Sequence, residues 1–531
     1  MKEWAVGWER RLNGVAQEVV CIAARGDVAL LPSIRPLGDL DDDPDVWGPD
    51  PAAFDAPPAI DPLRRRLRLA SLLRARARAE EAADDPVLAI ATADELCRLL
   101  DAAASAENVD WSRLPDLVAD KDLAQHWSRS ALFLKIIAEH WPDHLASEKL
   151  MDPAARRTKL LNTLADQWTD DPPQTPIVIA GSTGSVAAVR RLMSVVARLP
   201  RGIVLLPGLD TEMDEPAWKK ITEQHPQYGL RETLHDLGLE RGAIPVLKGA
   251  EETPQASARR ALFSEALAPA EITADWITRV KVAARDWGDS ASFMRAATEN
   301  LTLHAARTED EEANIAALAL RQALETPGRT AALVTPNNAL AQRVGAKLRR
   351  WGVDVAPSSG SPLAETAPGI LLDLLAALTA DDGDPVALAA LIKHPLAHFT
   401  GSDSARALEA KLLRGARSRD RLAEYLADAR ADKKLSAAIP VLETLSAILQ
   451  PLTDLFASSS TTLDAFAPKL AEAAEAIAPL PQSPWAGRAG DTAVRLLHDL
   501  ADSGDALGAF SRRQTPRLLR AMMQGHSVPP D

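Results

Sequence analysis

A short apolar run followed by a glycine-containing turn and an amphipathic segment constrains the fold of this chain most strongly. Residues 176–180, Pro-Ile-Val-Ile-Ala, have the length and composition of a buried strand. A turn follows at residues 181–185, and apolar residues then recur at helical spacing up to Leu199, where Pro200 ends the helix. A second apolar run at residues 203–206 predicts the next strand. A strand–helix–strand unit of this kind predicts two parallel strands joined by a right-handed crossover.

A second α/β stretch is predicted from about residue 300 to residue 355. Apolar runs predict strands at residues 301–303, 331–334 and 351–355. Helical spacing of apolar residues lies between them and predicts two helices. We therefore expect a second parallel sheet to begin here.

The remaining segments show helical patterns. Asp61-Pro62 and Asp152-Pro153 each place a capping side chain before a proline at the first helical position, which predicts helices at residues 62–79 and 153–168. The pattern from about residue 368 to residue 519 is almost wholly helical. A chain of 531 residues exceeds a single compact core, so we expect several domains.

Composition limits the classes of function. Lys plus Arg (60) against Asp plus Glu (74) gives a formal net charge of −14, which argues against nucleic-acid binding through bulk charge but leaves a local basic groove open. No apolar run reaches the ~18–20 residues that span a bilayer, and the opening residues carry no signal-peptide pattern. The two cysteines, Cys21 and Cys97, are too few for a disulfide framework. We expect a cytoplasmic protein without membrane contact.

The turn at residues 181–185 is the first candidate site. It lies between a strand and a helix N-terminus, where many α/β proteins bind a phosphate. A nucleotide hydrolase needs a lysine after the second glycine, and Ser185 stands there; no apolar strand ends in the Asp-Glu pair that would hold Mg²⁺. A plain structural turn and a DNA-phosphate contact both remain open. The candidate contacts are Gly181, Ser182, Thr183, Gly184 and Ser185.

Arginines on the predicted helix at residues 62–79 form the second candidate. Arg64, Arg65 and Arg68 belong to a run of seven arginines that continues to Arg78. The functional interpretation is phosphate contact along DNA. The alternative is a solvated helix face whose arginines pair with neighbouring acids.

Two histidine pairs have the i, i+4 spacing of zinc ligands: His140 with His144, and His394 with His398. A proline stands between the members of each pair, and neither carries a metalloprotease glutamate, so packing or capping is the favoured interpretation. Pro115-Asp116 followed by Ala119-Asp120-Lys121 is too compact for a metal-dependent nuclease site, and we interpret it as chance.

Several phrases of the sequence resemble one family when they are taken in order. These phrases lie at residues 30–39 (LLPSIRPLGD), 180–185 (AGSTGS), 206–210 (LPGLD), 225–230 (HPQYGL), 327–336 (PGRTAALVTP) and 393–396 (KHPL). Together they resemble AddB, the second subunit of the bacterial AddAB helicase–nuclease, in its alphaproteobacterial form. The resemblance runs from about Leu30 to the C-terminus.

The resemblance implies a superfamily-1 helicase-like α/β fold with two RecA-like parallel-sheet cores, the second incomplete, and large α-helical insertions. The implied domains are the N-terminal part of the first core (1–60), a helical insertion (61–168), the remainder of the first core (169–250), a helical connector (251–299), the start of the second core (300–367) and a truncated helical insertion (368–531). Residues 335–338 fall where active relatives carry a Tyr-Arg-x-Asn phrase, so Asn337 and Asn338 join the candidate DNA contacts.

Departures from the family limit what it implies about activity. Family members are about twice as long and end in a nuclease domain, which this sequence does not reach, and residues 1–25 do not resemble the usual opening. We therefore expect a truncated member that neither hydrolyses ATP nor cuts DNA alone, and that has no cofactor of its own, since the family complex uses ATP and Mg²⁺ through other parts.

The implied function is a non-motor subunit in double-strand break repair. It would bind an AddA-like helicase–nuclease subunit as a heterodimer and guide single-stranded or duplex-end DNA. Two alternatives stay open: an ATP-dependent helicase or ATPase in its own right, and an interaction scaffold that does not touch DNA.

Overall fold

The structure is a computed structural model that describes residues 56–106, 140–247, 252–355, 360–414 and 421–529, together with positions 37, 109–111, 113, 134 and 138. Three parts of the sequence interpretation lie outside these residues: nearly all of the first expected domain (1–60), the phrase at residues 30–39 apart from Leu37, and the Pro115-Asp116 motif.

Two compact units divide the chain. Unit 1 comprises residues 1–60 and 100–303, and unit 2 comprises residues 61–99 and 304–531. Both units are therefore discontinuous in sequence, and the expected helical insertion at residues 61–168 is divided between them.

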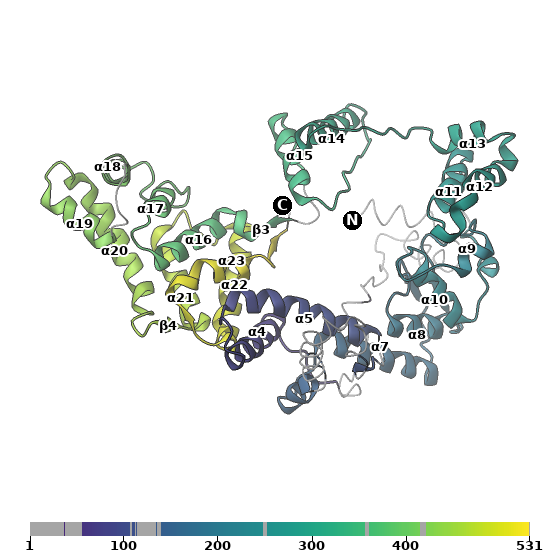
Figure 1. Ribbon diagram of the computed structural model, residues 1–531, viewed down its shortest axis with the longest axis horizontal. Coiled ribbons are helices and arrows are strands. Elements are labelled where there is room, and N and C mark those ends of the chain that lie inside the picture. The colour runs from purple at the N-terminus through teal and green to yellow at the C-terminus, as the bar shows by residue number, and fades with distance from the viewer. Residues whose placement is uncertain are drawn as a thin grey trace, which may run out of the picture. The chain divides into compact units, whose positions relative to one another are not determined.

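Unit 1 contains one parallel strand pair and a series of helices. Its elements are α7 (Pro153–Asp170), β1 (Ile177–Ala180), α8 (Ala187–Val196), β2 (Gly202–Leu205), α9 (Glu215–Lys219), α10 (Tyr228–Leu237), α11 (Pro254–Ala266), α12 (Trp276–Ala283) and α13 (Ser290–Ala297). Figure 1 shows α7, α8 and α10 following one another from the blue part of the chain.

The predicted strand–helix–strand unit is confirmed in this part of the chain. β1 pairs with β2 in parallel register, with Ile177 opposite Gly202 and Ala180 opposite Leu205. The buried face of α8, which includes Leu192 and Val196, packs against Ile179 and against leucines of α7. The two strands and their crossover helix are thus held by one apolar cluster.

Unit 2 is almost wholly helical. Its helices are α4 (Pro62–Ala79), α5 (Pro86–Ala106, up to residue 99), α14 (Glu309–Ala323), α15 (Asn338–Arg350), α16 (Ala367–Ala380), α17 (Pro385–Ile392), α18 (Asp403–Leu408), the π-helical turn η7 (Glu409–Leu413), α19 (Leu422–Ala431), α20 (Ile439–Asp454), α21 (Leu463–Ile477), α22 (Gly487–Ser503) and α23 (Thr515–Met523). Short antiparallel bridges pair β3 (Ser361–Pro362) with β6 (Ser527–Val528), and β4 (Ser460–Thr461) with β5 (Phe510–Ser511).

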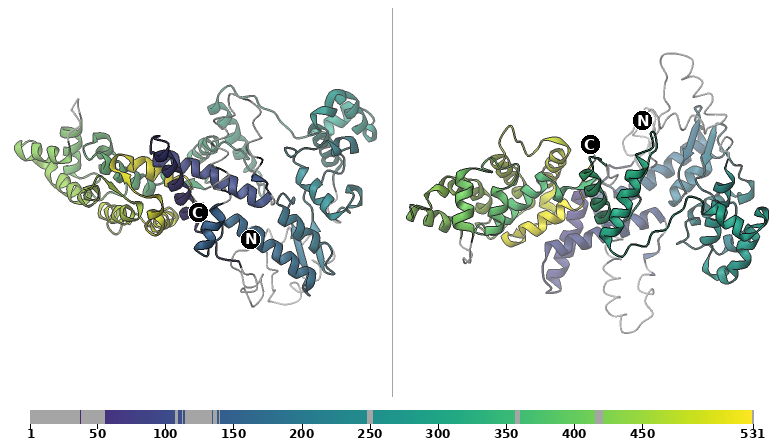
Figure 2. Two further views of the ribbon diagram at one scale, coloured as in Figure 1. Left: turned by 60° about the horizontal axis from the view of Figure 1, so that its bottom comes forward. Right: turned by 90° about the horizontal axis from the view of Figure 1, so that it is seen from above.

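α16 is the central helix of this unit. Leu371, Leu372 and Leu375 are completely buried, and α16 packs against α17, α20, α21, α22 and α23. α4 packs against α22, so the purple helix lies beside the yellow C-terminal part in both views of Figure 2. The expectation of a helical segment from residue 368 onward is confirmed.

The helix starts predicted from Asp-Pro pairs are confirmed, but only one aspartate caps its helix. The Asp61 carboxylate accepts a hydrogen bond from the Arg64 amide at 2.8 Å, as an N-cap does. Asp152 makes no side-chain cap; its carboxylate instead accepts a hydrogen bond from the Trp141 indole at 3.0 Å.

The strands predicted at residues 301–303, 331–334 and 351–355 are wrong. All three segments lack strand structure, while the predicted helices form as α14 and α15. Leu333 and Val353 pack against the α14–α15 pair, but Leu303 and Val334 are 97% and 93% exposed. A strand needs a hydrogen-bonding neighbour, and no strand of the described residues pairs with these segments.

The fold is therefore mostly helical; the described part of the chain contains one parallel strand pair, two short antiparallel pairs and an isolated parallel bridge between Ala59 and Met151. None of the helices described is both long enough and apolar enough to cross a membrane.

Hydrogen exchange tests the contrast between the two α/β stretches. We expect amides at residues 331–334 to exchange at least about tenfold faster than those amides at residues 177–180 that bond to the partner strand, such as Ile177, which donates to the Arg201 carbonyl at 3.1 Å. The amides of α15 (Asn338–Arg350) serve as an internal control, because they belong to the same stretch but lie within a helix. Equal protection of residues 331–334 and 177–180 would show that a sheet forms in the second stretch as well.

Candidate functional site

The turn at residues 181–185 joins the carboxyl end of β1 to α8. Gly181 and Ser185 are exposed, whereas Gly184 is buried and has a φ of +69°. The Gly184 amide donates a hydrogen bond to the Ser182 hydroxyl at 3.2 Å, which closes the turn locally. The structure thus brings all five candidate residues of this turn together on one edge of the strand pair.

Helix α10 packs against the turn at residues 181–185 through Thr233. The buried Thr233 hydroxyl lies 3.1 Å from the Thr183 carbonyl oxygen and 2.8 Å from that of Gly229. A Cβ atom added to Gly184 would stand 1.9 Å from the Thr233 hydroxyl oxygen. Only glycine fits at this position, because both the backbone conformation and the close approach of Thr233 exclude a side chain.

The N-terminus of α8 faces the exposed side of the turn. Its N-cap is Val186, which makes no side-chain cap, so no side chain accepts from the amides of the first turn. Arg190 lies one turn along the helix; it donates to the Gly184 carbonyl at 2.9 Å and pairs with Asp236 at 2.7 Å. This end of the helix carries the positive end of its dipole, which favours an anion.

The loop after β2 lies at the same carboxyl edge of the strand pair. The Gln227 side chain donates to the Gly208 carbonyl at 2.9 Å and accepts from the Asp210 amide at 3.0 Å. Asp210 in turn accepts from the amides of Glu212 and Met213, each at 2.9 Å. The side chains of Gln227 and Asp210 are thus hydrogen-bonded to the backbone of this loop. The turn at residues 181–185 remains the candidate surface for a ligand.

The arginines of α4 are largely engaged within unit 2. Arg65 is 5% exposed and donates to the Cys97 carbonyl at 3.3 Å, and Arg64 reaches Asp505 at 3.5 Å. Arg66 pairs with Asp94 at 2.6 Å, and Arg68 is half-buried. These contacts support the interpretation in which neighbouring acids neutralise the arginines of α4.

Arg74 contacts both the C-terminal segment and the α4–α5 connection. Its guanidinium donates to the carbonyl oxygens of Leu507 at 2.9 Å and Ala509 at 2.8 Å, and it pairs with Asp84 at 2.7 Å. The hydrogen bond from Arg74 lowers the pKa of Asp84, against the effect of burial, which raises it.

Asn337 and Asn338 lie at the start of α15 and are exposed. The Asn337 side chain accepts a hydrogen bond from the Leu340 amide at 3.1 Å, so it is the helix N-cap. These asparagines and the arginines of α4 belong to unit 2, whereas the 181–185 turn belongs to unit 1.

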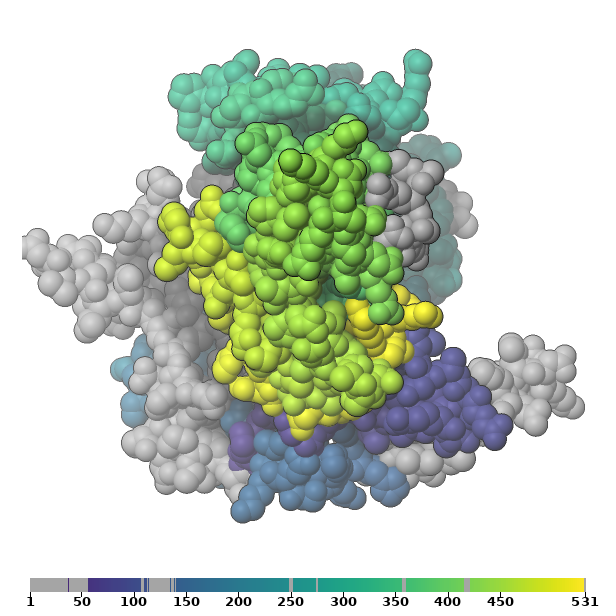
Figure 3. Space-filling model, turned by 90° about the vertical axis from the view of Figure 1, so that its left-hand side faces the viewer, coloured from purple at the N-terminus to yellow at the C-terminus, as the bar shows by residue number. Residues whose placement is uncertain are grey.

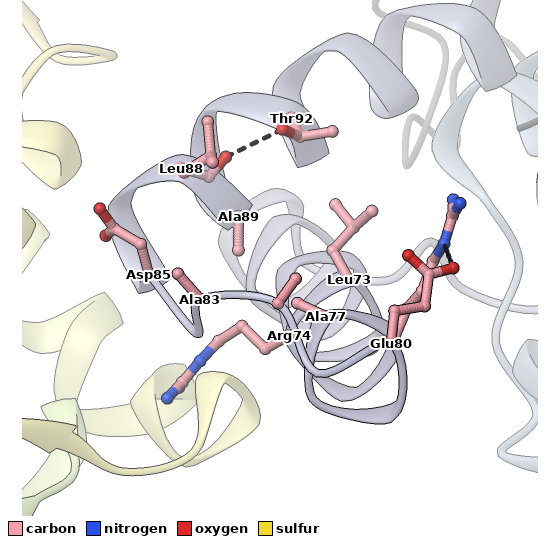
Figure 4. A pocket seen from close by; sticks show the side chains of 11 residues that line it. Leu73, Arg74, Ala77, Glu80, Ala83, Asp85, Leu88, Ala89 and Thr92 are labelled. Carbon is pink, nitrogen blue, oxygen red and sulfur yellow. Dashed lines mark hydrogen bonds and ion pairs between the residues drawn. The ribbon is translucent and has the colours of Figure 1, made fainter. Parts of the chain in front are cut away.

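A cavity of about 200 Å³ lies between the end of α4 and the start of α5. Figure 4 shows the Arg74 guanidinium pointing away from Leu73 and Ala77, toward the C-terminal segment, and Glu80 carries a dashed contact to an arginine that the structure identifies as Arg76. The volume is below the ~300–1,000 Å³ typical of ligand pockets. The polar side chains that line it already have partners: Arg76 pairs with Glu80, and Arg74 with Asp84 and two carbonyl oxygens. We assign it no ligand.

The second histidine pair makes packing and backbone contacts, whereas in the first pair His140 is exposed and His144 lies beside the Trp141 ring. His398 lies 2.8 Å from the Ile477 carbonyl oxygen, and the buried His394 ring accepts from the Leu396 amide at 3.3 Å. Burial lowers the pKa of His394, which keeps the ring neutral. Within the described residues, no group of three or more potential ligands is arranged to hold a metal ion.

Sequence reasoning did not identify Thr233 or Arg190 as parts of the turn site. Both residues lie on helices whose contact with the turn is tertiary. The phrase at residues 225–230 overlaps the start of α10, but it does not indicate that α10 contacts the turn at residues 181–185.

Comparison with known proteins adds no relative: no family model matches the chain, and no curated protein matches it at a significant level.

Substitution of Gly184 tests the geometry of the turn. We expect Gly184→Ala to destabilise unit 1 by about 2–4 kcal/mol, because the new Cβ meets Thr233 and the left-handed backbone becomes strained. Gly208→Ala is the matched control, since Gly208 has a φ of +63° with open space around it, and should cost only about 1 kcal/mol. Urea unfolding followed by circular dichroism measures both; equal losses would contradict the close approach of Thr233.

Substitution of Arg74 tests whether α4 is held by buried charge. We expect Arg74→Ala to destabilise unit 2 by roughly 2–4 kcal/mol, because the carbonyl oxygens of Leu507 and Ala509 lose their donor and Asp84 keeps only the more distant Arg78, at 3.6 Å. Arg98→Ala removes an exposed arginine paired with Glu95 and should change stability by less than ~0.5 kcal/mol.

The stability difference between Arg74→Ala and the parent chain should depend on pH. The pKa of Asp84 is lowered in the folded protein, so its contribution is fully present above its unfolded pKa, near about 4, and is lost as pH falls through the folded value. The difference in urea midpoint between Arg74→Ala and the parent chain should therefore become smaller below about pH 4, and the part that remains is due to the carbonyl contacts of Arg74, which do not titrate. A constant difference would argue against the ion pair.

Proposed function

We propose that the chain is a non-motor DNA-handling subunit of the AddB type, which acts in double-strand break repair. The observation that carries the proposal is the exposed turn at residues 181–185, which presents a glycine-rich backbone, the exposed Ser185 hydroxyl and the uncapped start of α8 at the carboxyl edge of a parallel strand pair. The ordered phrases that resemble the AddB family support the same assignment.

The chemistry of the turn favours phosphate contact without hydrolysis. Backbone amides and a hydroxyl are suitable donors to a phosphodiester, which carries a single negative charge. Hydrolysis of a nucleotide would also need a lysine on the outer phosphates and a carboxylate on Mg²⁺, and Ser185 occupies the place of that lysine. In this proposal the single DNA strand slides past the turn. Contacts to the phosphates of the DNA guide it, irrespective of the base sequence.

The motor function belongs to the partner in this proposal. An AddA-like subunit would supply ATP hydrolysis, Mg²⁺ and unwinding in the cytoplasm, and this chain would form the heterodimer and hold the other strand. The two RecA-like cores of the family are part of the proposal, with β1, α8 and β2 as the described part of the first core.

Binding of fluorescein-labelled oligo(dT), followed by anisotropy across a salt series, tests the proposal. We expect the full chain to bind, and Ser185→Glu to weaken binding by about fivefold to tenfold, because a carboxylate at a phosphate contact is repelled. Ser458→Glu adds the same charge at an exposed position of unit 2 and should leave the affinity unchanged. Absence of binding by the parent chain would favour an interaction scaffold without DNA contact.

ATP provides the second readout. At 100 times its dissociation constant a bound nucleotide would stabilise the chain by ~2.7 kcal/mol, so we expect no thermal shift with ATP–Mg²⁺ and no hydrolysis with or without DNA. Hydrolysis that a point substitution in this chain abolishes would contradict the proposal and favour an ATPase.

A further inference from the structure

Exposed cations of unit 2 gather around the π-helical turn η7 (Glu409–Leu413), which continues α18. Lys393 directly follows α17, Lys411 lies on η7, Arg414 directly follows η7, and Lys433 and Lys434 precede the 3-10 turn η8 (Ser436–Ala438). All five side chains are exposed. We name this set the η7 surface.

Hydrogen bonds join these cations in two groups. Lys393 Nζ lies 2.7 Å, and Arg414 Nη2 2.9 Å, from the same oxygen of Glu409, Oε1. Lys411 Nζ donates to the Lys434 carbonyl oxygen at 2.6 Å. Both groups meet on η7, which packs against α17 and α18, while α18 also packs against η8.

The charge of the η7 surface is only partly neutralised. Hydrogen bonds from Lys393 and then from Arg414 lower the pKa of Glu409, so this carboxylate stays ionised and offsets one of its two partners. Among the described residues, no carboxylate lies within ion-pair distance of Lys411, Lys433 or Lys434. The cations of α4 differ, because Arg66, Arg74 and Arg76 each have an acidic partner.

The backbone of η7 is unusual in the same place. A π-helical turn is less stable than an α-helical one and is found frequently at functional sites. Leu412 is completely buried and anchors the turn, while Lys411 on one side of it is exposed. Both groups of cations therefore contact one anchored segment, through Glu409 and Lys411.

The neighbouring side chains decide which anion fits. A membrane-binding surface usually combines cations with exposed apolar or aromatic residues that enter the bilayer. Among the described residues 390–440 no large apolar side chain is exposed, and on α17 itself the one exposed large apolar side chain is Val386. The green atoms of this region face the viewer in Figure 3. A polyanion in solution fits this composition better than a lipid surface.

We propose that the η7 surface binds the sugar–phosphate backbone of single-stranded DNA. This inference rests on the proposed function and adds a second contact region to it, on unit 2. The absence of exposed aromatic side chains from the described part of the surface indicates phosphate contacts without base stacking, and therefore binding that is independent of sequence.

Alanine variants of the full chain test the η7 surface through salt dependence. We expect Lys393→Ala with Arg414→Ala to weaken oligo(dT) binding by about tenfold and to reduce the slope of log K against log salt by roughly 1.4, which is ~0.7 for each lost phosphate contact. Lys433→Ala with Lys434→Ala is the second variant, and it should act similarly; both side chains lie in an exposed loop, so folding is preserved. Lys469→Ala with Arg98→Ala removes a half-exposed and an exposed cation elsewhere and should change neither quantity.

Glu409→Gln gives a prediction of opposite sign. Removing the carboxylate while keeping Lys393 and Arg414 should tighten binding by about twofold to fivefold, since the local positive charge rises. A merely structural role of the ion pairs would not increase affinity, so an unchanged or lower affinity overturns the electrostatic account.

The outcomes separate this inference from the proposed function. If the chain binds oligo(dT) and Ser185→Glu weakens it, but both η7 variants behave like the control, the η7 surface is wrong and the function stands. If the parent chain does not bind, both fail. If the variants lose binding to phosphatidylglycerol vesicles and keep binding to oligo(dT), the surface is a membrane site and the inference is overturned.

Discussion

The buried guanidinium of Arg74 is the interaction on which the architecture of unit 2 depends. It satisfies two carbonyl oxygens near the end of α22 and a carboxylate in the α4–α5 connection at once, so that a helix from the first fifth of the chain belongs to the same compact body as the last. A buried charge is stable only when its hydrogen bonds are made, which gives this junction one geometry. Together with the packing of α4 against α22, this contact places residues 61–99 in the same unit as the C-terminal part of the chain.

Local features could be predicted from the sequence, and features that depend on distant partners could not. The helix starts after Asp61 and Asp152 and the strand–helix–strand unit at residues 177–205 are encoded by capping residues and apolar periodicity within a few turns. The apolar runs in the second α/β stretch look the same locally, but a strand also needs a neighbour, which periodicity does not specify. The Leu333 side chain packs against α14 and α15 and the Val334 side chain is exposed, which is the alternation of a strand. No neighbouring strand among the described residues pairs with this segment.

The candidate site shows the same limit. The turn at residues 181–185 was recognisable because it is continuous in sequence, whereas Thr233, which excludes any side chain at Gly184, lies fifty residues away. The clustering of arginines in the sequence did not predict accessible positive charge. Arginines of the run on α4 form ion pairs and hydrogen bonds to carbonyl oxygens. The cations of the η7 surface are dispersed over some forty positions and meet only after α17, α18 and η8 have packed.

The contact between Arg74 and Leu507 also sets an order of events during synthesis. These residues are 433 positions apart. At ~5–20 residues per second, α4 would leave the ribosome roughly 20–90 s before its acceptors exist. Unit 1 lies largely between them in sequence and acquires its strand pair during that interval. The acidic partners of Arg66, Arg74 and Arg76 lie within the α4–α5 hairpin and are made with it, whereas the carbonyl acceptors of Arg74 arrive last, so water must solvate that part of its guanidinium until then.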